Sequence, residues 1–75
     1  TNPQARKIRV VGQGTAYNWI LNALHRNGYT EGADSDISIE IRKNGSLNYL
    51  LRKPSGEGIE IGSVENLIHQ IKALE

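Results

Sequence analysis

The stretches Ile-Ser-Ile-Glu-Ile at residues 37–41 and Leu-Asn-Tyr-Leu-Leu at residues 47–51 decide the fold of this chain. In the first stretch, isoleucines alternate with polar residues, which is the pattern of a strand with one buried face. The second stretch is also typical of a strand, and the segment Arg-Lys-Asn-Gly-Ser at residues 42–46 joins the two. An Asn-Gly pair between two such runs predicts a β-hairpin.

The length of the hairpin loop decides which side chains share a face, because a shift of one residue turns a whole strand over. A two-residue Asn-Gly turn would place the isoleucines and the second strand's apolar residues on opposite faces. A three-residue loop over residues 43–45, with its glycine in a left-handed conformation, instead pairs Ile41 with Leu47 and Ile39 with Tyr49. The sequence therefore predicts the three-residue loop and one shared apolar face.

A third strand and a closing helix follow the hairpin. Residues 54–56, Pro-Ser-Gly, predict a turn, and the alternation over residues 59–61 predicts a strand. Ser63 is a suitable N-cap, and Glu65 complements the dipole of the helix that begins there. The inward stripe of this helix is predicted to be Val64, Leu67, Ile68, Ile71 and Leu74.

The amino-terminal half predicts one more strand and one more helix. Residues 8–11 suit a short strand, and Gly12-Gln13-Gly14 ends it in a tight turn. Thr15 is expected to cap a helix over residues 16–27, which Gly28 closes in the left-handed conformation. The helical spacing gives a buried stripe of Ala16, Trp19, Ile20, Ala23 and Leu24, widened by Tyr17 and Leu21.

Together these elements predict an α+β fold in the order β-α-β-β-β-α. It is a small two-layer sandwich in which a three-stranded antiparallel meander packs against two helices. The 75 residues, of which 37% are hydrophobic, suffice for a single domain over residues 6–75 after a flexible lead-in at residues 1–5. The position of the first strand in the sheet stays open.

Composition argues against several classes of function. The chain has no cysteine, which excludes disulfides and thiolate metal sites, and no apolar run near the ~18 residues of a membrane span. His25 and His69 lie on separate predicted helices without a carboxylate or second histidine at metal spacing. We therefore expect no enzymatic activity, no metal, no cofactor and no membrane partner, and a cytoplasmic location.

Charge is arranged in blocks of one sign, although the net charge is only +1. One basic block spans residues 42–53, on a hairpin whose outer face could enter the major groove of DNA. Glu40 and Glu60 oppose phosphate binding, and an ordinary solvated sheet with cross-strand charge pairs is the alternative. The candidate nucleic-acid-binding residues are Arg42, Lys43, Asn44, Asn48, Arg52 and Lys53.

The order of elements over residues 39–73 resembles the three-stranded amino-terminal DNA-binding modules of phage-type integrases. This resemblance of pattern covers about half of the chain and implies DNA rather than RNA as the partner. The function predicted first is thus a small non-enzymatic nucleic-acid-binding domain with an accessory or regulatory role.

The alternative function is protein–protein interaction or homodimerisation through the first helix. About half of that helix's circumference is apolar, more than packing on one sheet requires. The candidate interface residues are Tyr17, Trp19 and Leu21, since aromatic anchors carry much of the binding energy at interfaces. Tyr17 and Leu21 could instead pack internally, against the first strand or the loop over residues 29–36.

Overall fold

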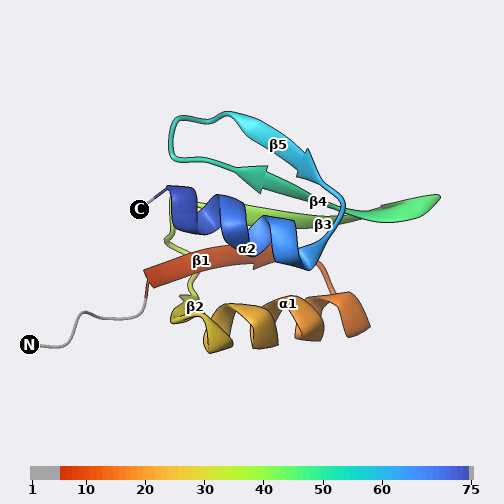
Figure 1. The fold of residues 1–75 in the computed structure, drawn as a ribbon, viewed down its shortest axis with the longest axis horizontal. Coiled ribbons are helices and arrows are strands. Elements are labelled where there is room, and N and C mark those ends of the chain that lie inside the picture. The colour runs from red at the N-terminus through yellow and green to blue at the C-terminus, as the bar shows by residue number, and fades with distance from the viewer. Residues whose placement is uncertain (1–5, 75) are drawn as a thin grey trace, which may run out of the picture.

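A computed structural model describes residues 6–74, so the predicted lead-in at residues 1–5 lies outside the described residues. Within this range the chain forms a five-stranded sheet and two helices (Figure 1). In chain order the elements are β1 (Arg6–Val11), α1 (Thr15–Arg26), β2 (Tyr29–Glu31), β3 (Ser38–Asn44), β4 (Ser46–Arg52), β5 (Gly58–Ile61) and α2 (Val64–Ala73).

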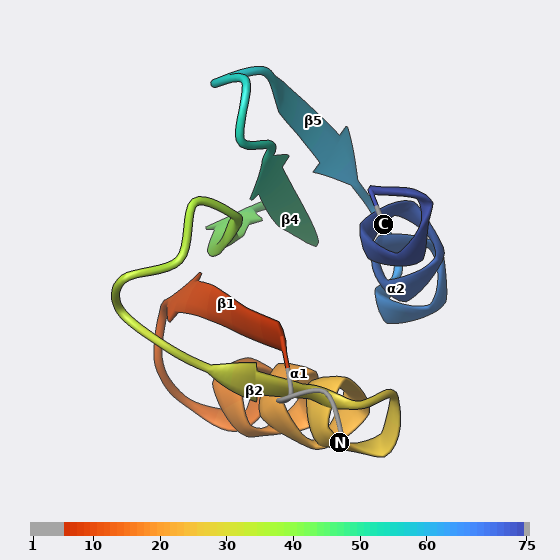
Figure 2. The ribbon, with the colours of Figure 1, turned by 90° about the vertical axis from the view of Figure 1, so that its left-hand side faces the viewer.

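The predicted α+β class and the antiparallel meander are confirmed. Strands β3, β4 and β5 pair in succession as antiparallel neighbours. Helix α1 packs on β1 and β2, helix α2 packs on β4 and β5, and the two helices also touch each other. Figure 2 shows α2 on the side opposite to the one on which the chain passes between β2 and β3, and α1 shares the face of α2 because the two helices touch. The sheet therefore has one covered face and one face without a helix.

The first strand lies inside the sheet, which has the order β2-β1-β3-β4-β5. It runs parallel to both of its neighbours, β2 and β3. Strand β2 is missing from the predicted order of elements, because its three residues are too few to show a period-two pattern and residues 31–35 read as a turn. Part of the loop expected over residues 29–36 is therefore a strand, and its first residue, Tyr29, is buried.

The chain crosses β1 within a short segment, residues 32–37. Strand β2 ends opposite Ile8, and β3 begins opposite the next residue, Arg9. The amide of Gly32 donates to the carbonyl of Ile8 (3.0 Å), and the amide of Arg9 donates to the carbonyl of Ile37 (2.9 Å). These bonds continue the ladders on both edges of β1, so the crossing segment is fixed at both of its ends.

The β3–β4 hairpin keeps the predicted faces but not the predicted register. Ile41 pairs with Tyr49 rather than with Leu47, and the ladder continues to Asn44 and Ser46, on either side of Gly45. Gly45 has a φ of 84°, a conformation that favours glycine, and this allows the chain to reverse more tightly than in a three-residue loop. The pairing is shifted by an even number of residues, so the apolar face is preserved. The hairpin tip projects past the other elements (Figure 1), and Leu47 is consequently 36% exposed instead of buried.

Both helices end and begin close to the predicted residues. The Ser63 side chain accepts a hydrogen bond from the Asn66 amide at 3.2 Å, which confirms the predicted N-cap of α2. Thr15 is not a cap: it is the first residue of α1, and Gly14 precedes it without a side-chain cap. At the other end of α1, Gly28 has a φ of 86°, as expected for the residue that closes a helix.

The core is formed between the covered face of the sheet and the two helices. Alternate residues of the strands point inward and meet one stripe from each helix. Trp19 is the exception to the predicted stripe of α1, since it is 58% exposed. The buried hydrophobic residues are Ile8, Val10, Ile20, Ala23, Leu24, Tyr29, Ile37, Ile39, Tyr49, Leu51, Ile61, Leu67, Ile68 and Ile71.

Candidate functional site

Three of the predicted nucleic-acid-binding residues interact with groups of the chain itself. Arg42 Nη2 lies 3.5 Å from Glu40 Oε1, and Lys53 Nζ lies 3.6 Å from Glu57 Oε1. The guanidinium of Arg52 donates to the carbonyl of Gly56 at 3.1 Å. These contacts fit the solvated sheet that was the alternative, but they lie within β3 and within the β4–β5 turn rather than across strands as expected.

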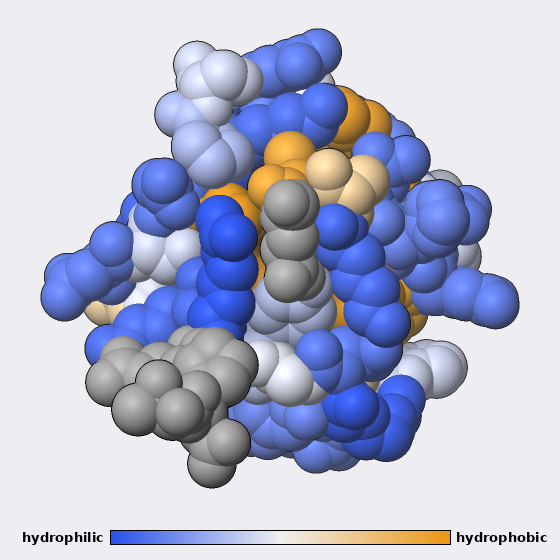
Figure 3. Space-filling model, turned by 60° about the vertical axis from the view of Figure 1, so that its left-hand side comes forward, coloured by the Kyte–Doolittle hydropathy of each residue, from blue (hydrophilic) through white to orange (hydrophobic). Residues whose placement is uncertain are grey.

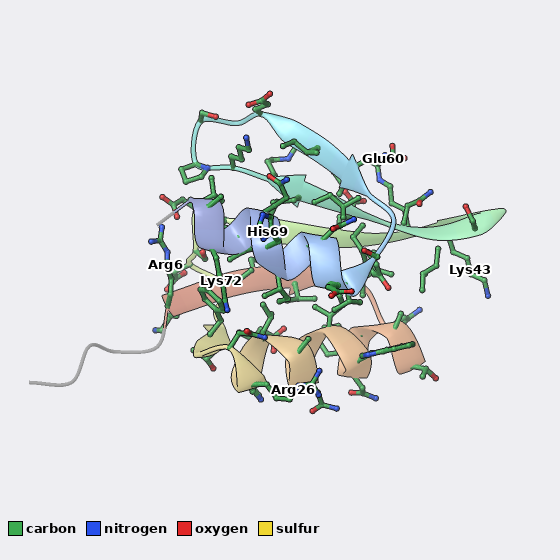
Figure 4. The ribbon with its side chains drawn as sticks, in the orientation of Figure 1. Arg6, Arg26, Lys43, Glu60, His69 and Lys72 are labelled. Atoms are coloured by element: carbon green, nitrogen blue, oxygen red, sulfur yellow. The ribbon has the colours of Figure 1, made fainter. Side chains whose placement is uncertain are left out.

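The remaining residues of that predicted set are spread along the hairpin. Asn48 is half-buried opposite Arg42, and Lys43 is exposed near the hairpin tip. Figure 4 shows Lys43 at the projecting end, away from both helices. Asn44 ends β3, and its side chain is not among those described. The structure thus places this set along a ribbon without converging it on one point.

The three predicted interface residues of α1 separate in the structure. Tyr17 and Leu21 are half-buried and pack against the core. The Tyr17 hydroxyl donates a hydrogen bond to the carboxylate of Glu31 on β2, and this bond raises the pKa of Tyr17 above its ordinary value of 10.0. Tyr17 therefore makes the internal contact that the sequence analysis had considered.

Trp19 borders a groove between the two helices. The groove has a volume of about 410 Å³, and α1 and α2 both contribute to its walls. Ala23, Val64 and Ile68 supply its apolar lining beside the indole, whereas Arg26 and Glu65 supply one charge of each sign. An exposed tryptophan next to an apolar groove is the composition of a protein-binding hot spot.

The two charged residues at this groove complement the dipoles of the helices that carry them. Arg26 stands in the last turn of α1, and Glu65 in the first turn of α2, where each complements its helix dipole. Figure 4 shows Arg26 on the outer side of α1. Both residues are exposed, so both charges remain available to a partner.

A second, larger hollow lies at the start of α1. Its volume is about 690 Å³, and its walls come from residues 12–16 and from the hairpin residues Ile41, Lys43 and Leu47. The turn predicted for Gly12-Gln13-Gly14 is confirmed by the positive φ of both glycines.

Histidines do not converge with acids in the described part of the chain. His25 and His69 are both exposed, and Figure 4 shows His69 on α2. Residues 6–74 contain no group of three or more His, Cys, Asp or Glu side chains that could hold a metal ion. Neither helix of this range is long and apolar enough to cross a membrane.

Two cations on the face of the sheet without a helix were not among the predicted site residues. Lys7 and Arg9 alternate with the buried residues Ile8 and Val10, and both are exposed. That alternation was visible in the sequence, but the place of β1 beside β3 was not. At the end of the molecule that comes forward in Figure 3, hydrophilic residues cover most of the surface, and apolar residues occupy a small central area.

Comparison with protein families gives one match: the model of the iron ABC transporter C-terminal domain matches residues 5–72. Neither curated proteins nor solved structures gave a match. The family match overturns the prediction of a DNA-binding or regulatory domain, because it indicates a function in transport. It also replaces nucleic acid, and the homodimer offered beside it, with a transporter as the partner context.

Proposed function

We propose, from the premise that the chain belongs to the iron ABC transporter C-terminal domain family, that it is a protein-interaction domain of such a transporter. In this proposal it binds another protein of the transporter and carries out no catalysis of its own. The cytoplasmic location expected from the sequence is part of the same proposal.

The observation that carries the proposal is the exposure of Trp19. Trp19 is 58% exposed, which leaves a large apolar surface in water. Tryptophan is enriched among the residues that dominate interface energies, and grooves between two helices accept amphipathic helices. The groove beside Trp19 offers such a place.

The chemistry of the groove indicates what kind of helix would fit. Its floor is apolar, from Ala23, Val64 and Ile68, so the bound helix would present an apolar stripe. Arg26 and Glu65 stand at its borders, so an acidic and a basic residue beside that stripe would complement them. A helix of this kind from another transporter subunit is the proposed occupant.

The test uses Trp19 as a reporter, since the chain has a single tryptophan. The protein is labelled with 5-fluorotryptophan, and its fluorine NMR signal is followed while the purified remaining subunits of the iron transporter are added. Burial of the indole at an interface should shift and broaden this signal. Binding is measured in parallel by biolayer interferometry with unlabelled protein.

Variants at two exposed apolar positions distinguish a specific interface from nonspecific hydrophobic association. Trp19→Ala should weaken binding by about thirtyfold or more, which corresponds to the ~2 kcal/mol of a hot-spot residue. Leu47→Ala removes exposed apolar surface at the hairpin tip and should leave affinity unchanged. An unperturbed fluorine signal, or equal affinities of the two variants, would show that the groove is not the interface.

A further inference from the structure

The face of the sheet without a helix carries an ordered arrangement of charges that the groove of α1 and α2 does not involve. Strand pairing sets Arg9, Ser38, Arg52 and Gly58 side by side across β1, β3, β4 and β5. Paired residues project on the same face, so two arginines stand on either side of a serine. We call these four residues the arginine row.

Both guanidinium groups of the arginine row are available for binding. Arg9 and Arg52 are exposed, and the ion pairs among residues 6–74 involve other cations, Arg42 and Lys53. Arg52 is oriented by its bond to the carbonyl of Gly56, which uses one of its five N–H donors. A guanidinium that is held in place loses less entropy when it binds a carboxylate.

The small residues of the row leave space above the sheet. Ser38 separates Arg9 from Arg52, so the two arginines are two strands apart, or ~10 Å at the backbone. A Cβ at Gly58 would lie 3.2 Å from Leu50 Cδ1 and 3.8 Å from Arg52 Nη1. The missing side chain at Gly58 thus leaves room for these two neighbours.

The next row along the sheet has a different character. It contains Val11, Glu40, Leu50 and Glu60 side by side, in which apolar and acidic residues alternate. Figure 4 shows Glu60 on β5. A uniformly anionic surface, such as a lipid bilayer or a nucleic acid, would set phosphates against Glu60 and against Glu40, whose carboxylate already pairs with Arg42. A polypeptide can place an acid over one row and apolar or basic residues over the other.

We propose that this face binds a segment of a protein partner in which separate acidic residues contact Arg9 and Arg52, since the Arg52 guanidinium is held toward Gly56 and Gly58, away from Arg9. Apolar and basic side chains of the same segment lie over the row that contains Glu40 and Glu60. The complementarity of charge identifies the partner as an acid-containing polypeptide, because it satisfies both rows. This surface is on the other side of the sheet from the Trp19 groove, and the proposal does not depend on the groove.

The test is an amide NMR titration of the labelled chain with a short synthetic peptide that contains glutamate, leucine and lysine. Amide signals of residues 9, 38 and 52 should shift, and the shifts should decrease as salt is added, since the contact is electrostatic. The same peptide with glutamine in place of glutamate should bind about tenfold more weakly, the difference expected for a charge-assisted hydrogen bond.

Charge-matched variants locate the contact. Arg9→Gln and Arg52→Gln should each weaken peptide binding about tenfold, whereas Lys43→Gln, the same change at the hairpin tip, should not alter it. Amide spectra of the free variants check that all three are folded. Equal effects at Arg9, Arg52 and Lys43, or peptide shifts confined to other residues, would overturn the proposal.

Anionic surfaces supply the competing outcomes. Phosphatidylglycerol vesicles and duplex DNA are titrated against the same protein under the same salt conditions. Weaker binding of both than of the glutamate peptide supports a polypeptide partner, whereas stronger binding of either one overturns it. The wild-type chain could fail to bind the glutamate peptide while the fluorine signal of Trp19 still responds to the transporter subunits. That result would reject this surface alone and leave the proposal for the helix groove intact.

Discussion

The two faces of the sheet are built from the same strands, but one face is buried under the helices and the other is exposed. Along β1, Ile8 and Val10 are buried under the helices, while Lys7 and Arg9 between them are exposed. Along β4, Leu51 is completely buried and its neighbour Leu50 is half-buried on the other side. The difference teaches that burial, and not residue type alone, separates positions that stabilise the fold from positions that are free to bind.

The strongest way to test this comparison is to truncate two adjacent leucines. Leu51→Ala should lower the free energy of unfolding by ~2–5 kcal/mol, because it opens a cavity in the core. Leu50→Ala, on the open face, should cost less than ~1 kcal/mol. Urea denaturation followed by circular dichroism measures both, and similar losses would show that the open face is covered in solution.

A second pair of substitutions compares two glycines outside the strands, one next to Ile41 of the covered face and the other next to Lys7 of the open face. A Cβ at Gly12 would lie 2.8 Å from Ile41 Cδ1 and 2.9 Å from its Cβ, and the φ of 150° disfavours a side chain as well. A Cβ at Gly32 would meet Lys7, at 2.7 Å from its Cδ and 2.8 Å from its Cβ, and Lys7 is exposed.

A Cβ at either glycine would crowd a Cβ that is fixed to the backbone, but only Gly12 also has a φ that disfavours a side chain. We therefore expect Gly12→Ala to cost ~2 kcal/mol and Gly32→Ala ~1 kcal/mol. Chemical denaturation of both variants gives the difference. A larger loss at Gly32 would mean that the crossing segment is packed as tightly as the covered face.

The smallest effect concerns the Tyr17–Glu31 contact at the edge of the covered face. The hydrogen bond to Glu31 raises the pKa of Tyr17 above 10.0. A raised pKa means that the folded state holds the proton more tightly, so the contact stabilises the fold below pH 10 and is lost as the pH rises through the folded-state value. Glu31→Gln should therefore let Tyr17 ionise at lower pH.

The ring-carbon NMR signal of Tyr17 measures this ionisation during a pH titration. Glu57→Gln, at an exposed acid on the β4–β5 connection, serves as the control and should leave the Tyr17 curve in place. If Tyr17 ionises at the same pH in both variants, Glu31 is not the cause of its raised pKa.

Most of the predicted elements could be read from local patterns. Alternation identified the strands of the meander, helical spacing identified the two helices, and Ser63 and Gly28 marked helix ends correctly. Strand β2 was missed because three residues carry too little periodicity. The exact hairpin register was also missed, since parity fixes only the face and several tight loops share the same parity.

The candidate site was less predictable than the fold. Trp19 stood in the predicted inward stripe and was also a predicted interface residue, and only the structure shows that it is 58% exposed. The hairpin cations were visible, but their contacts with Glu40, Glu57 and Gly56 were not. Nucleic acid was inferred from the charge of one segment, without the surrounding acids being weighed strongly enough, and the family match shows that this inference was wrong.

The sequence by itself determined the α+β class, the covered face of the meander strands and the start of α2, because these depend on interactions between residues close together in the chain. Only the tertiary structure decided that β1 lies between β2 and β3, which places Arg9 in one row with Arg52. It also decided that α1 and α2 form a groove beside Trp19. Such long-range pairings depend on how all the apolar faces are buried at once, and no local pattern specifies that.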